Sequence, residues 1–261
     1  MKDYDREKLI QRYYSARAQE YDRQKSRTWQ SIRGFRNEVF EAILQGLKNC
    51  NNKLLLEVGV GSGRNAKPVL ERTNTYLVGL DLSKEMLGAA RSKLTKHKEK
   101  FDLILGGAED LPLIDAAFDA ILCISTMHYF SDQEKALDAF QKLLKKKGIL
   151  IYGDLTKHES DDEDFFENLE RAVSKAHARY YKASEMKGLM KRTGFHILRT
   201  TTIEYLKRYD ALIEDKGRYF GIGIDAINRL TRAATSRTRK QYALTDRRLT
   251  QFYTVITSTK A

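Results

Sequence analysis

The amino-acid sequence predicts an α/β fold built on a seven-stranded, mostly parallel, Rossmann-like sheet with helices on both faces. Two observations carry this prediction. Apolar segments typical of buried strands alternate with amphipathic segments typical of helices, an alternation that favours parallel strands joined by helical crossovers. The first strand also runs into a glycine-rich turn before a helix, as in open α/β sheets that bind nucleosides at the ends of their strands.

The expected elements divide the 261 residues into four parts. Residues 1–49 form an N-terminal helical cap, with helical patterns at 3–24 and 28–48. Residues 50–205 form the core, with expected strands at 53–58, 75–80, 101–105, 118–124, 149–153 and 195–205, and helices at 64–72, 83–95, 132–145, 161–179 and 184–192. We expect Ser83 to cap the helix at 83–95 and Gly148 to stop the helix at 132–145. A polar, arginine-rich insert, 206–248, precedes a final strand at 249–258 that completes the sheet within residues 249–261.

The most informative segment lies where the first strand ends. The apolar strand ends on Glu57, and glycines follow at three alternate positions, Gly59, Gly61 and Gly63. The second strand, eighteen residues after the last glycine, ends on Asp81, a separation typical of a carboxylate that accepts from ribose hydroxyls. Two acids and a glycine turn at neighbouring strand ends indicate a nucleoside pocket.

The glycine spacing indicates which nucleoside this is. A dinucleotide fingerprint has glycines at relative positions 1, 3 and 6, whereas here they fall at 1, 3 and 5 and Arg64 stands at position 6. The Gly-Lys-Ser/Thr ending of a phosphate loop is also missing from this segment. The pattern favours a ligand without phosphate whose cationic group suits Glu57. S-adenosylmethionine, with its ammonium, sulfonium, ribose and adenine groups, fits.

Composition limits the remaining function classes. The N-terminal residues are too polar for a secretory signal, and no stretch has the length of apolar residues that a membrane span needs. The two cysteines, Cys50 and Cys123, cannot form a disulfide framework, and no His/Cys cluster has metal-ligand spacing. We therefore expect a cytoplasmic protein without a metal. The net charge of +12 is concentrated in residues 1–49 and 199–261, which carry +4 and +7, whereas residues 50–198 carry +1. Basic flanks around a neutral core favour an anionic substrate.

Over residues 10–205 the chain resembles the class I S-adenosylmethionine-dependent methyltransferases, and most of all the group around the quinone-biosynthesis C-methyltransferases. The segments that carry the resemblance recur in the order typical of the group: 13–22, 56–63, 78–87, 107–113, 118–121, 125–130 and 143–148. The sequence departs from the group at Gly107, where an aspartate usually contacts the adenine amino group. Glu109 or a water could substitute for that aspartate.

The resemblance implies roles for individual residues. Glu57 orients the methionine end of the cofactor, the three glycines make room for it, and Asp81 holds the ribose hydroxyls. Leu82 and Met86 lie beside the adenine and Ala108 offers its backbone to the base. Ile124 and Ser125 line the methionine side, and Tyr14 and Tyr21 close over the top. The product would be S-adenosylhomocysteine.

Methyl transfer from a sulfonium needs alignment and exclusion of water, and a base only where the acceptor must lose a proton. His128, just past the fourth strand, is the candidate base, although a locally hydrogen-bonded histidine is the alternative interpretation. His97, His158, His177 and His196 have no acidic partner that the sequence identifies. We interpret them as surface or packing residues.

The insert at 206–248 joins an apolar, glycine-containing piece at 219–224 to a group of cationic residues, Arg229, Arg232, Arg237, Arg239, Lys240, Arg247 and Arg248. It is either a lid that grips a phosphate or carboxylate of the acceptor or a solvated helix face. Three functions stay open: a methyltransferase for a small or medium, anionic acceptor, an RNA methyltransferase of the tRNA type, and a non-catalytic S-adenosylmethionine-binding protein. We favour the first, because the sequence contains no separate RNA-binding module.

Overall fold

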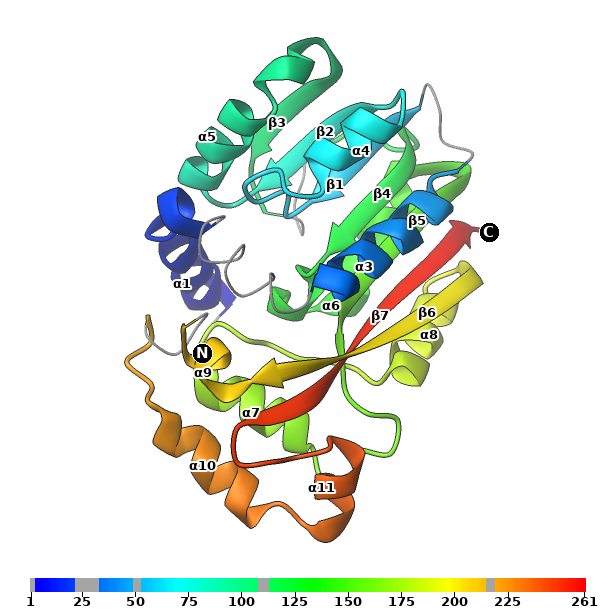
Figure 1. Cartoon of the computed structure of the whole chain (residues 1–261). Coiled ribbons are helices and arrows are strands. Elements are labelled where there is room, and N and C mark those ends of the chain that lie inside the picture. Colours follow the sequence, from blue (N-terminus) through cyan, green and yellow to red (C-terminus); the bar gives the residue numbers. More distant parts are fainter. Residues whose placement is uncertain (1–2, 22–32, 49–52, 108–112, 215–218) are drawn as a thin grey trace.

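The computed structural model describes the chain except for residues 1–2, 22–32, 49–52, 108–112 and 215–218 (Figure 1). Seven strands form one sheet in the order β3-β2-β1-β4-β5-β7-β6, in which β7 runs antiparallel to both of its neighbours and the other pairs are parallel. The strands are β1 (Leu54–Val58), β2 (Tyr76–Asp81), β3 (Phe101–Leu105), β4 (Phe118–Ile124), β5 (Leu144–Thr156), β6 (Phe195–Arg208) and β7 (Arg248–Lys260). The mostly parallel, seven-stranded α/β fold is confirmed.

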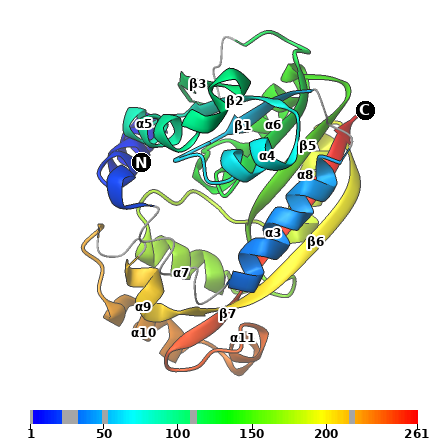
Figure 2. The ribbon, with the colours of Figure 1, turned by 45° about the horizontal axis from the view of Figure 1, so that its top comes forward.

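Helices cover both faces of the sheet because their apolar stripes pack against alternate side chains of the strands. One face is covered by α3 (Arg33–Gly46), α4 (Ala66–Arg72) and α5 (Lys84–Lys93), and the other by α6 (Gln133–Leu143) and α8 (Ala183–Arg192). Ser83 caps α5 by accepting from Met86 N at 3.1 Å, as expected. Figure 2 shows α3 lying along β6 and β7. Of the two helical patterns expected as a cap, α3 therefore belongs to the core, and only α1 (Asp3–Ser15) stands apart from the sheet.

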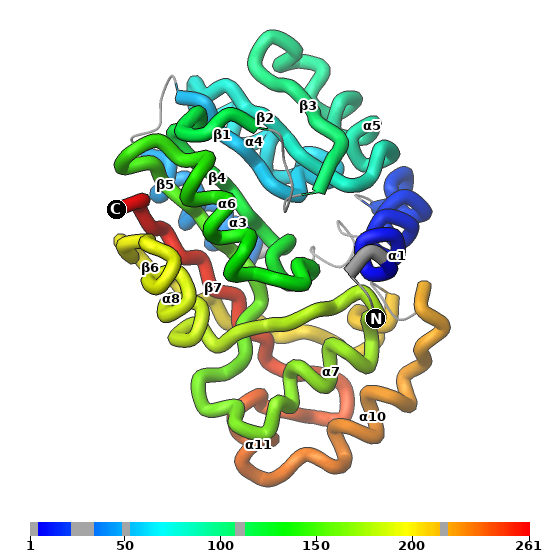
Figure 3. The backbone as a smooth tube through the Cα atoms, turned by 180° about the vertical axis from the view of Figure 1, so that it is seen from behind, coloured from blue at the N-terminus to red at the C-terminus, as the bar shows by residue number. Residues whose placement is uncertain are grey.

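The long strands β6 and β7 extend past the rest of the sheet and carry a second, smaller core. This core joins α7 (Phe165–Val173), α9 (Tyr209–Leu212), α10 (Ile224–Ala233) and the residue after α11 (Ser236–Gln241) through a set of buried side chains, among them Phe166, Tyr209, Ile227, Tyr242 and Phe252. Figure 3 shows α7, α10 and α11 together at one end of the molecule. The insert is thus folded against α7.

Three expected boundaries are wrong. The helix expected at 132–145 ends at Leu143, and β5 begins at Leu144 because this residue pairs with Phe118, so Gly148 stops no helix and lies within the strand. The helix expected at 161–179 spans only Phe165–Val173. It begins where Asp161 accepts from Phe165 N and Phe166 N. The helix expected at 3–24 is interrupted after Ser15 by a turn at residues 16–17.

None of the helices in the described part of the chain has the length and apolar character that a bilayer crossing requires.

Candidate active site

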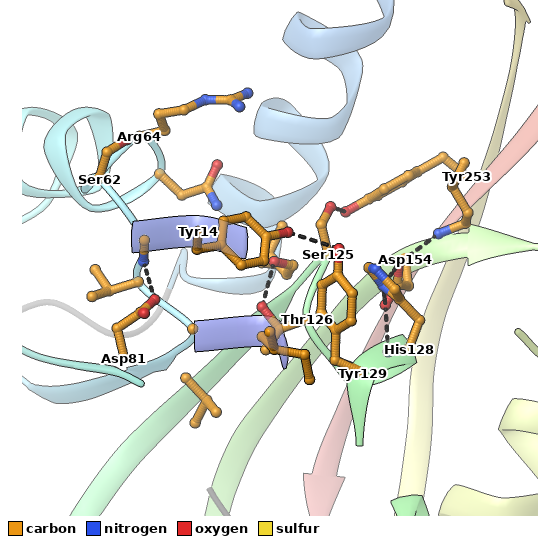
Figure 4. A pocket seen from close by; sticks show the side chains of 18 of the residues that line it. Tyr14, Ser62, Arg64, Asp81, Ser125, Thr126, His128, Tyr129, Asp154 and Tyr253 are labelled. Carbon is orange, nitrogen blue, oxygen red and sulfur yellow. Dashed lines mark hydrogen bonds and ion pairs between the residues drawn. The ribbon is translucent and has the colours of Figure 1, made fainter. Parts of the chain in front are cut away.

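A cavity of about 460 Å³ lies at the carboxyl ends of the parallel strands. The residues that follow β1 and β2, together with α1, line one side, which we call the glycine half. The residues that follow β4 and the last residues of β5 line the other side, together with α3, α7, β6 and β7, and we call it the histidine half. Figure 4 shows Asp81 at one end of the group of lining residues and His128 with Asp154 at the other.

The glycine half is built from backbone. Gly59, Gly61 and Gly63 have φ angles of +72°, +54° and +76°, which favour glycine over residues with a side chain. A Cβ on Gly59 would lie 2.3 Å from Thr126 Oγ1, so the turn can approach β4 only without a side chain. A Cβ on Gly61 would meet no atom nearer than 4.0 Å. Gly59 and Gly61 line the cavity, whereas Gly63 packs on α5 beside Ala90.

Asp81 is fixed at the cavity wall by backbone donors. Gly61 N donates to Oδ2 at 2.8 Å and Ser83 N donates to Oδ1 at 2.9 Å. Burial raises the pKa of Asp81, and these backbone donors act in the opposite direction. The carboxylate is therefore held rigidly at the end of β2 and keeps lone pairs for a further donor.

Glu57 lies under the glycine turn and does not line the cavity. It is 1% exposed, and Asn65 Nδ2 donates to its Oε1 at 3.3 Å. Its Oε2 is buried and has no hydrogen-bond partner among the described residues. Burial, together with the nearby Asp81, raises the pKa of Glu57 to about 8 despite the Asn65 hydrogen bond. A cation in the cavity above the turn would favour the charged form of this group.

Tyrosines of the N-terminal segment close the glycine half. Tyr14 and Tyr21 line the cavity, and their ring centroids lie 5.9 Å apart. Tyr14 Oη is 2.8 Å from Tyr129 Oη, and the Arg64 guanidinium lies 5.6 Å from the Tyr21 ring centroid. Tyr13 points the other way and stacks on Phe220 of the insert at 5.3 Å.

The histidine half contains a buried histidine and carboxylate. His128 Nδ1 lies 2.9 Å from both carboxylate oxygens of Asp154, and His128 N donates to Asp154 Oδ2 at 3.2 Å. A proton on Nδ1, shared with the carboxylate, places the lone pair of the neutral ring on Nε2. His128 is 5% exposed and Asp154 is 1% exposed, so the pair is shielded from bulk water. This arrangement can orient a general base.

Next to this pair, β4 ends in a strained conformation. Ser125 has φ +53°, which is unusual for a residue with a side chain and is often found at functional sites. Its Oγ is 2.8 Å from Tyr253 Oη. Ser125 and Ile124 both line the cavity, as do Leu82 and Met86 from the β2–α5 segment.

Several lining residues have no counterpart in the sequence prediction, namely Glu7, Phe35, Arg36, Thr126, Asp154, Glu170, Tyr180, Tyr205, Lys207, Gln251 and Tyr253. Asp154 could have been predicted as a site residue from the sequence, because it follows the apolar strand expected at 149–153 just as Asp81 follows the apolar strand expected at 75–80. Gln251 lies far from any motif. Tyr205 Oη donates to Gln251 Oε1 at 2.6 Å, and Gln251 Nε2 is buried without a hydrogen-bond partner among the described residues.

Of the two interpretations of the insert, the structure favours a solvated face for its arginines. Among the described residues, none of the cationic residues from Arg229 to Arg248 lines the cavity, and Lys207 and Leu212 are the described residues of the insert that do so. The acidic run at 159–164 holds the insert instead: Arg237 Nη2 donates to Asp162 at 2.9 Å and Tyr242 Oη donates to Asp161 at 2.6 Å. Buried contacts with α7 therefore turn this charge away from the site.

His177 has an acidic partner, contrary to the expectation from the sequence. Its Nε2 lies 3.1 Å from Glu167 Oε2. Burial acts to raise the pKa of Glu167, but the contact with His177 and a backbone donor outweigh it and lower the pKa. Ala108 and Glu109 lie outside the described residues. Within the residues described, no three His, Cys, Asp or Glu side chains gather as metal ligands.

Comparisons with known proteins agree with this geometry. A family model described as a methyltransferase domain matches residues 56–152, which span the segment from β1 into β5. Demethylmenaquinone methyltransferase of Thermotoga maritima is 34% identical over 119 residues, which are 45% of this chain and 48% of that protein. An uncharacterised protein of Methanocaldococcus jannaschii is 28% identical over 146 residues, 56% of this chain and 66% of its own. The chain thus spans about half of the first relative and slightly under two thirds of the second.

Solved structures share the fold. The YcgJ protein from Bacillus subtilis superposes with a TM-score of 0.73 at 23% identity, covering 86% of this chain and 98% of its own. Phosphoethanolamine N-methyltransferase 2 of Haemonchus contortus, solved with S-adenosylhomocysteine, superposes with a TM-score of 0.56 at 17% identity, covering 84% and 52%. The match over residues 56–152 and the relatives named as methyltransferases support a class I S-adenosylmethionine-dependent methyltransferase domain in this chain, and the solved structures show that it has the same fold.

Proposed function

We propose that the whole chain is an S-adenosylmethionine-dependent methyltransferase whose acceptor is a small or medium, anionic molecule bound in the histidine half. One observation carries the proposal: a single cavity joins the glycine turn and Asp81 to the buried His128–Asp154 pair. A cofactor site alone would need no oriented base beside it. S-adenosylmethionine supplies a sulfonium methyl group that passes to the acceptor by in-line displacement.

The charged residues of the histidine half support an anionic acceptor. Lys207, 7% exposed, and Arg36 line this half beside the buried acid Glu170, so the two cations outnumber the carboxylates that are not engaged with His128. Asp154 is engaged with His128, so its charge is directed at the imidazole and not at the acceptor. A hydroxyl that gives its proton to His128 would leave an oxyanion near these cations.

Within the methyltransferases we place the chain beside the quinone-biosynthesis C-methyltransferase-like group. The 34% identity with the Thermotoga enzyme over 119 residues supports this placement. The free, buried thiol of Cys123 is consistent with the reducing cytoplasm that we expect for this protein. That no metal takes part stays our expectation.

A transfer assay with a radiolabelled methyl group tests the proposal. Cell extract is separated into small-molecule, lipid and RNA fractions and incubated with the labelled donor and the protein. We expect label in the small-molecule fraction, much less label with Asp81→Ala because donor binding is weakened, and retained donor binding with strongly reduced transfer for His128→Ala. Donor binding without label in any fraction would favour the non-catalytic alternative.

RNA is the second candidate acceptor, and the surface of the insert favours it. Arg229, Arg232, Lys240 and Arg248 are exposed, and within the described part of the chain none of them makes an ion pair. Exposed, unpaired cations suit a phosphate backbone. Label confined to the RNA fraction, with an affinity that falls steeply as salt rises, would replace the small acceptor by RNA.

A further inference from the structure

The glycine half continues beyond Asp81 into a slot at the end of β2. Leu82 and Met86 supply apolar walls, and Gly106 supplies backbone from the end of β3. Glu7 and Ile10 of α1 line the same part of the cavity, and Leu82 packs against the small core that contains Ile10. The slot follows directly on the carboxylate that we assign to the ribose hydroxyls. A flat, apolar opening beyond a ribose site suits the base of a nucleoside.

A carboxylate from α1 stands at this slot. A Cβ built on Gly107 would lie 3.4 Å from Glu7 Oε1 and 3.5 Å from Leu82 Cδ2. The Glu7 carboxylate therefore borders the space into which a side chain at residue 107 would project. Because residue 107 is glycine, that space is free of a side chain from residue 107. Glu7 is exposed and, among the described residues, makes no hydrogen bond and no ion pair, so its carboxylate is open to water or to a ligand in the slot.

We infer that Glu7 accepts a hydrogen bond from the exocyclic amino group of adenine, so that α1 selects the base of the cofactor. An ionised carboxylate only accepts hydrogen bonds. Adenine presents an amino donor at its 6-position, whereas a base with a carbonyl oxygen there would face the carboxylate with a second acceptor. This inference rests on the proposed function, because it takes the nucleoside in the glycine half to be S-adenosylmethionine. It assigns to α1 a contact that the sequence analysis left to Glu109 or a water.

Calorimetry with two ligands tests this role. S-adenosylhomocysteine is compared with its analogue in which hydrogen replaces the 6-amino group of the base. We expect the protein to bind the amino form about tenfold more tightly, the size of one hydrogen bond to a charged group that is partly exposed to solvent. In Glu7→Ala the preference should fall to about twofold or less, because affinity for the amino form drops while affinity for the analogue stays unchanged.

Two comparison variants make the result specific. Asp5→Asn removes the same charge from the same helix at a residue that does not line the cavity, and it should keep the full preference. Glu109→Ala tests the other assignment. A preference that survives Glu7→Ala, or that is lost in Asp5→Asn or in Glu109→Ala alone, would overturn the inference.

A relocation experiment adds a gain of function. In the double variant Glu7→Ala, Gly107→Asp, the new carboxylate projects into the space that Glu7 gave up, and the preference for the amino form should return. If it does not, Glu7 and residue 107 do not serve the same contact and the inference is wrong. Failure of the unaltered protein to bind S-adenosylhomocysteine at all would instead refute the proposed cofactor, so the two failures can be told apart.

Discussion

The two halves of the cavity are held together in different ways. In the glycine half, the backbone groups Gly61 N and Ser83 N fix Asp81. In the histidine half, contacts join side chains to one another, such as His128 with Asp154, Tyr205 with Gln251 and Ser125 with Tyr253. A binding surface made of backbone groups keeps its shape when many side chains are substituted. A cavity wall made of side chains changes its shape and polarity with each substitution. The glycine half can therefore stay constant while the histidine half determines the acceptor.

If this division holds, substitutions in the histidine half change turnover and leave cofactor binding intact. The largest effect should come from His128→Ala. We expect turnover to fall by about 10²- to 10⁴-fold, the usual contribution of a general base, with an unchanged affinity for S-adenosylhomocysteine. Steady-state kinetics with the acceptor identified by the transfer assay, together with calorimetry, separates the two quantities.

The control is His196→Gln, an exposed residue of β6 outside the cavity, which should keep full turnover. Asp154→Asn should lower turnover less than His128→Ala, since the ring remains but the partner that orients it is changed. Equal loss of cofactor binding and turnover in His128→Ala would mean that the halves are not independent.

The converse variant, Asp81→Ala, acts on the glycine half. It removes the carboxylate that we expect to accept hydrogen bonds from the ribose hydroxyls. Gly61 N and Ser83 N also lose the hydrogen bonds that they donate to this carboxylate. We expect affinity for S-adenosylhomocysteine to fall by about 100-fold, as two hydrogen bonds to a charged group imply. Asp102→Asn, an exposed acid of β3 outside the cavity, should leave the affinity within about twofold of the original. Calorimetry that finds a similar loss for both variants would contradict a specific ribose contact.

Glu57 gives the stability of the glycine half a pH dependence. Because burial raises its pKa from 4.5 to about 8, the folded protein holds this proton more tightly than the unfolded chain does. Stability of the ligand-free protein should therefore fall as pH rises from about 5 to 8, by a few kcal/mol at most, and level off above that range. Glu57→Gln should flatten this slope.

Thermal unfolding followed by calorimetry at pH 5.5 and 8 measures the slope. Gln has the same shape and no titration, and the hydrogen bond with Asn65 can persist through its amide. A slope that is identical in both proteins would show that Glu57 is ionised throughout this range. The buried Oε2 would then need a donor that the described residues do not provide.

The sequence allowed several lining residues of the glycine half to be named, such as Gly59, Gly61 and Asp81, because the geometry there is encoded locally. The strand, the three glycines and Asp81 fall within one β–α–β unit, and positive φ angles and a strand-end carboxylate leave a pattern of fixed spacing. Glu57 shows the limit of that pattern: the spacing placed it at the site, but only the packing shows that it lies beneath the turn.

Most of the histidine half could not be predicted, because tertiary contacts assemble it. His128 was found from its place after a strand, and Asp154 could have been found by the same rule. Lys207 reaches the cavity because β6 continues to Arg208, beyond the predicted end of that strand at residue 205. Gln251 lies in a strand that was predicted, but the pairing of β7 with β5 and β6, which brings it to the cavity, was not. The sequence showed that the insert is positively charged, but it did not show which way the charged side chains face. Contacts of Arg237 and Tyr242 with the acidic run at 159–164 determine how the insert is oriented.

The smallest effect on turnover is expected from substitutions in the insert. Measuring this effect tests whether the acceptor binds in the histidine half alone. Arg229 and Arg232 lie on the exposed side of α10, while Ile227 and Thr231 of the same helix are buried. For a small acceptor, the double variant Arg229→Ala, Arg232→Ala should change kcat/KM by less than about twofold, because neither residue lines the cavity. For RNA it should weaken binding and reduce the salt dependence by about one unit of slope for each phosphate that an arginine no longer neutralises. Filter binding across salt concentrations, measured beside the transfer assay, distinguishes the two outcomes. A large loss of kcat/KM with a small acceptor would show that the acceptor contacts α10. The acceptor site would then include residues of the insert in addition to the histidine half.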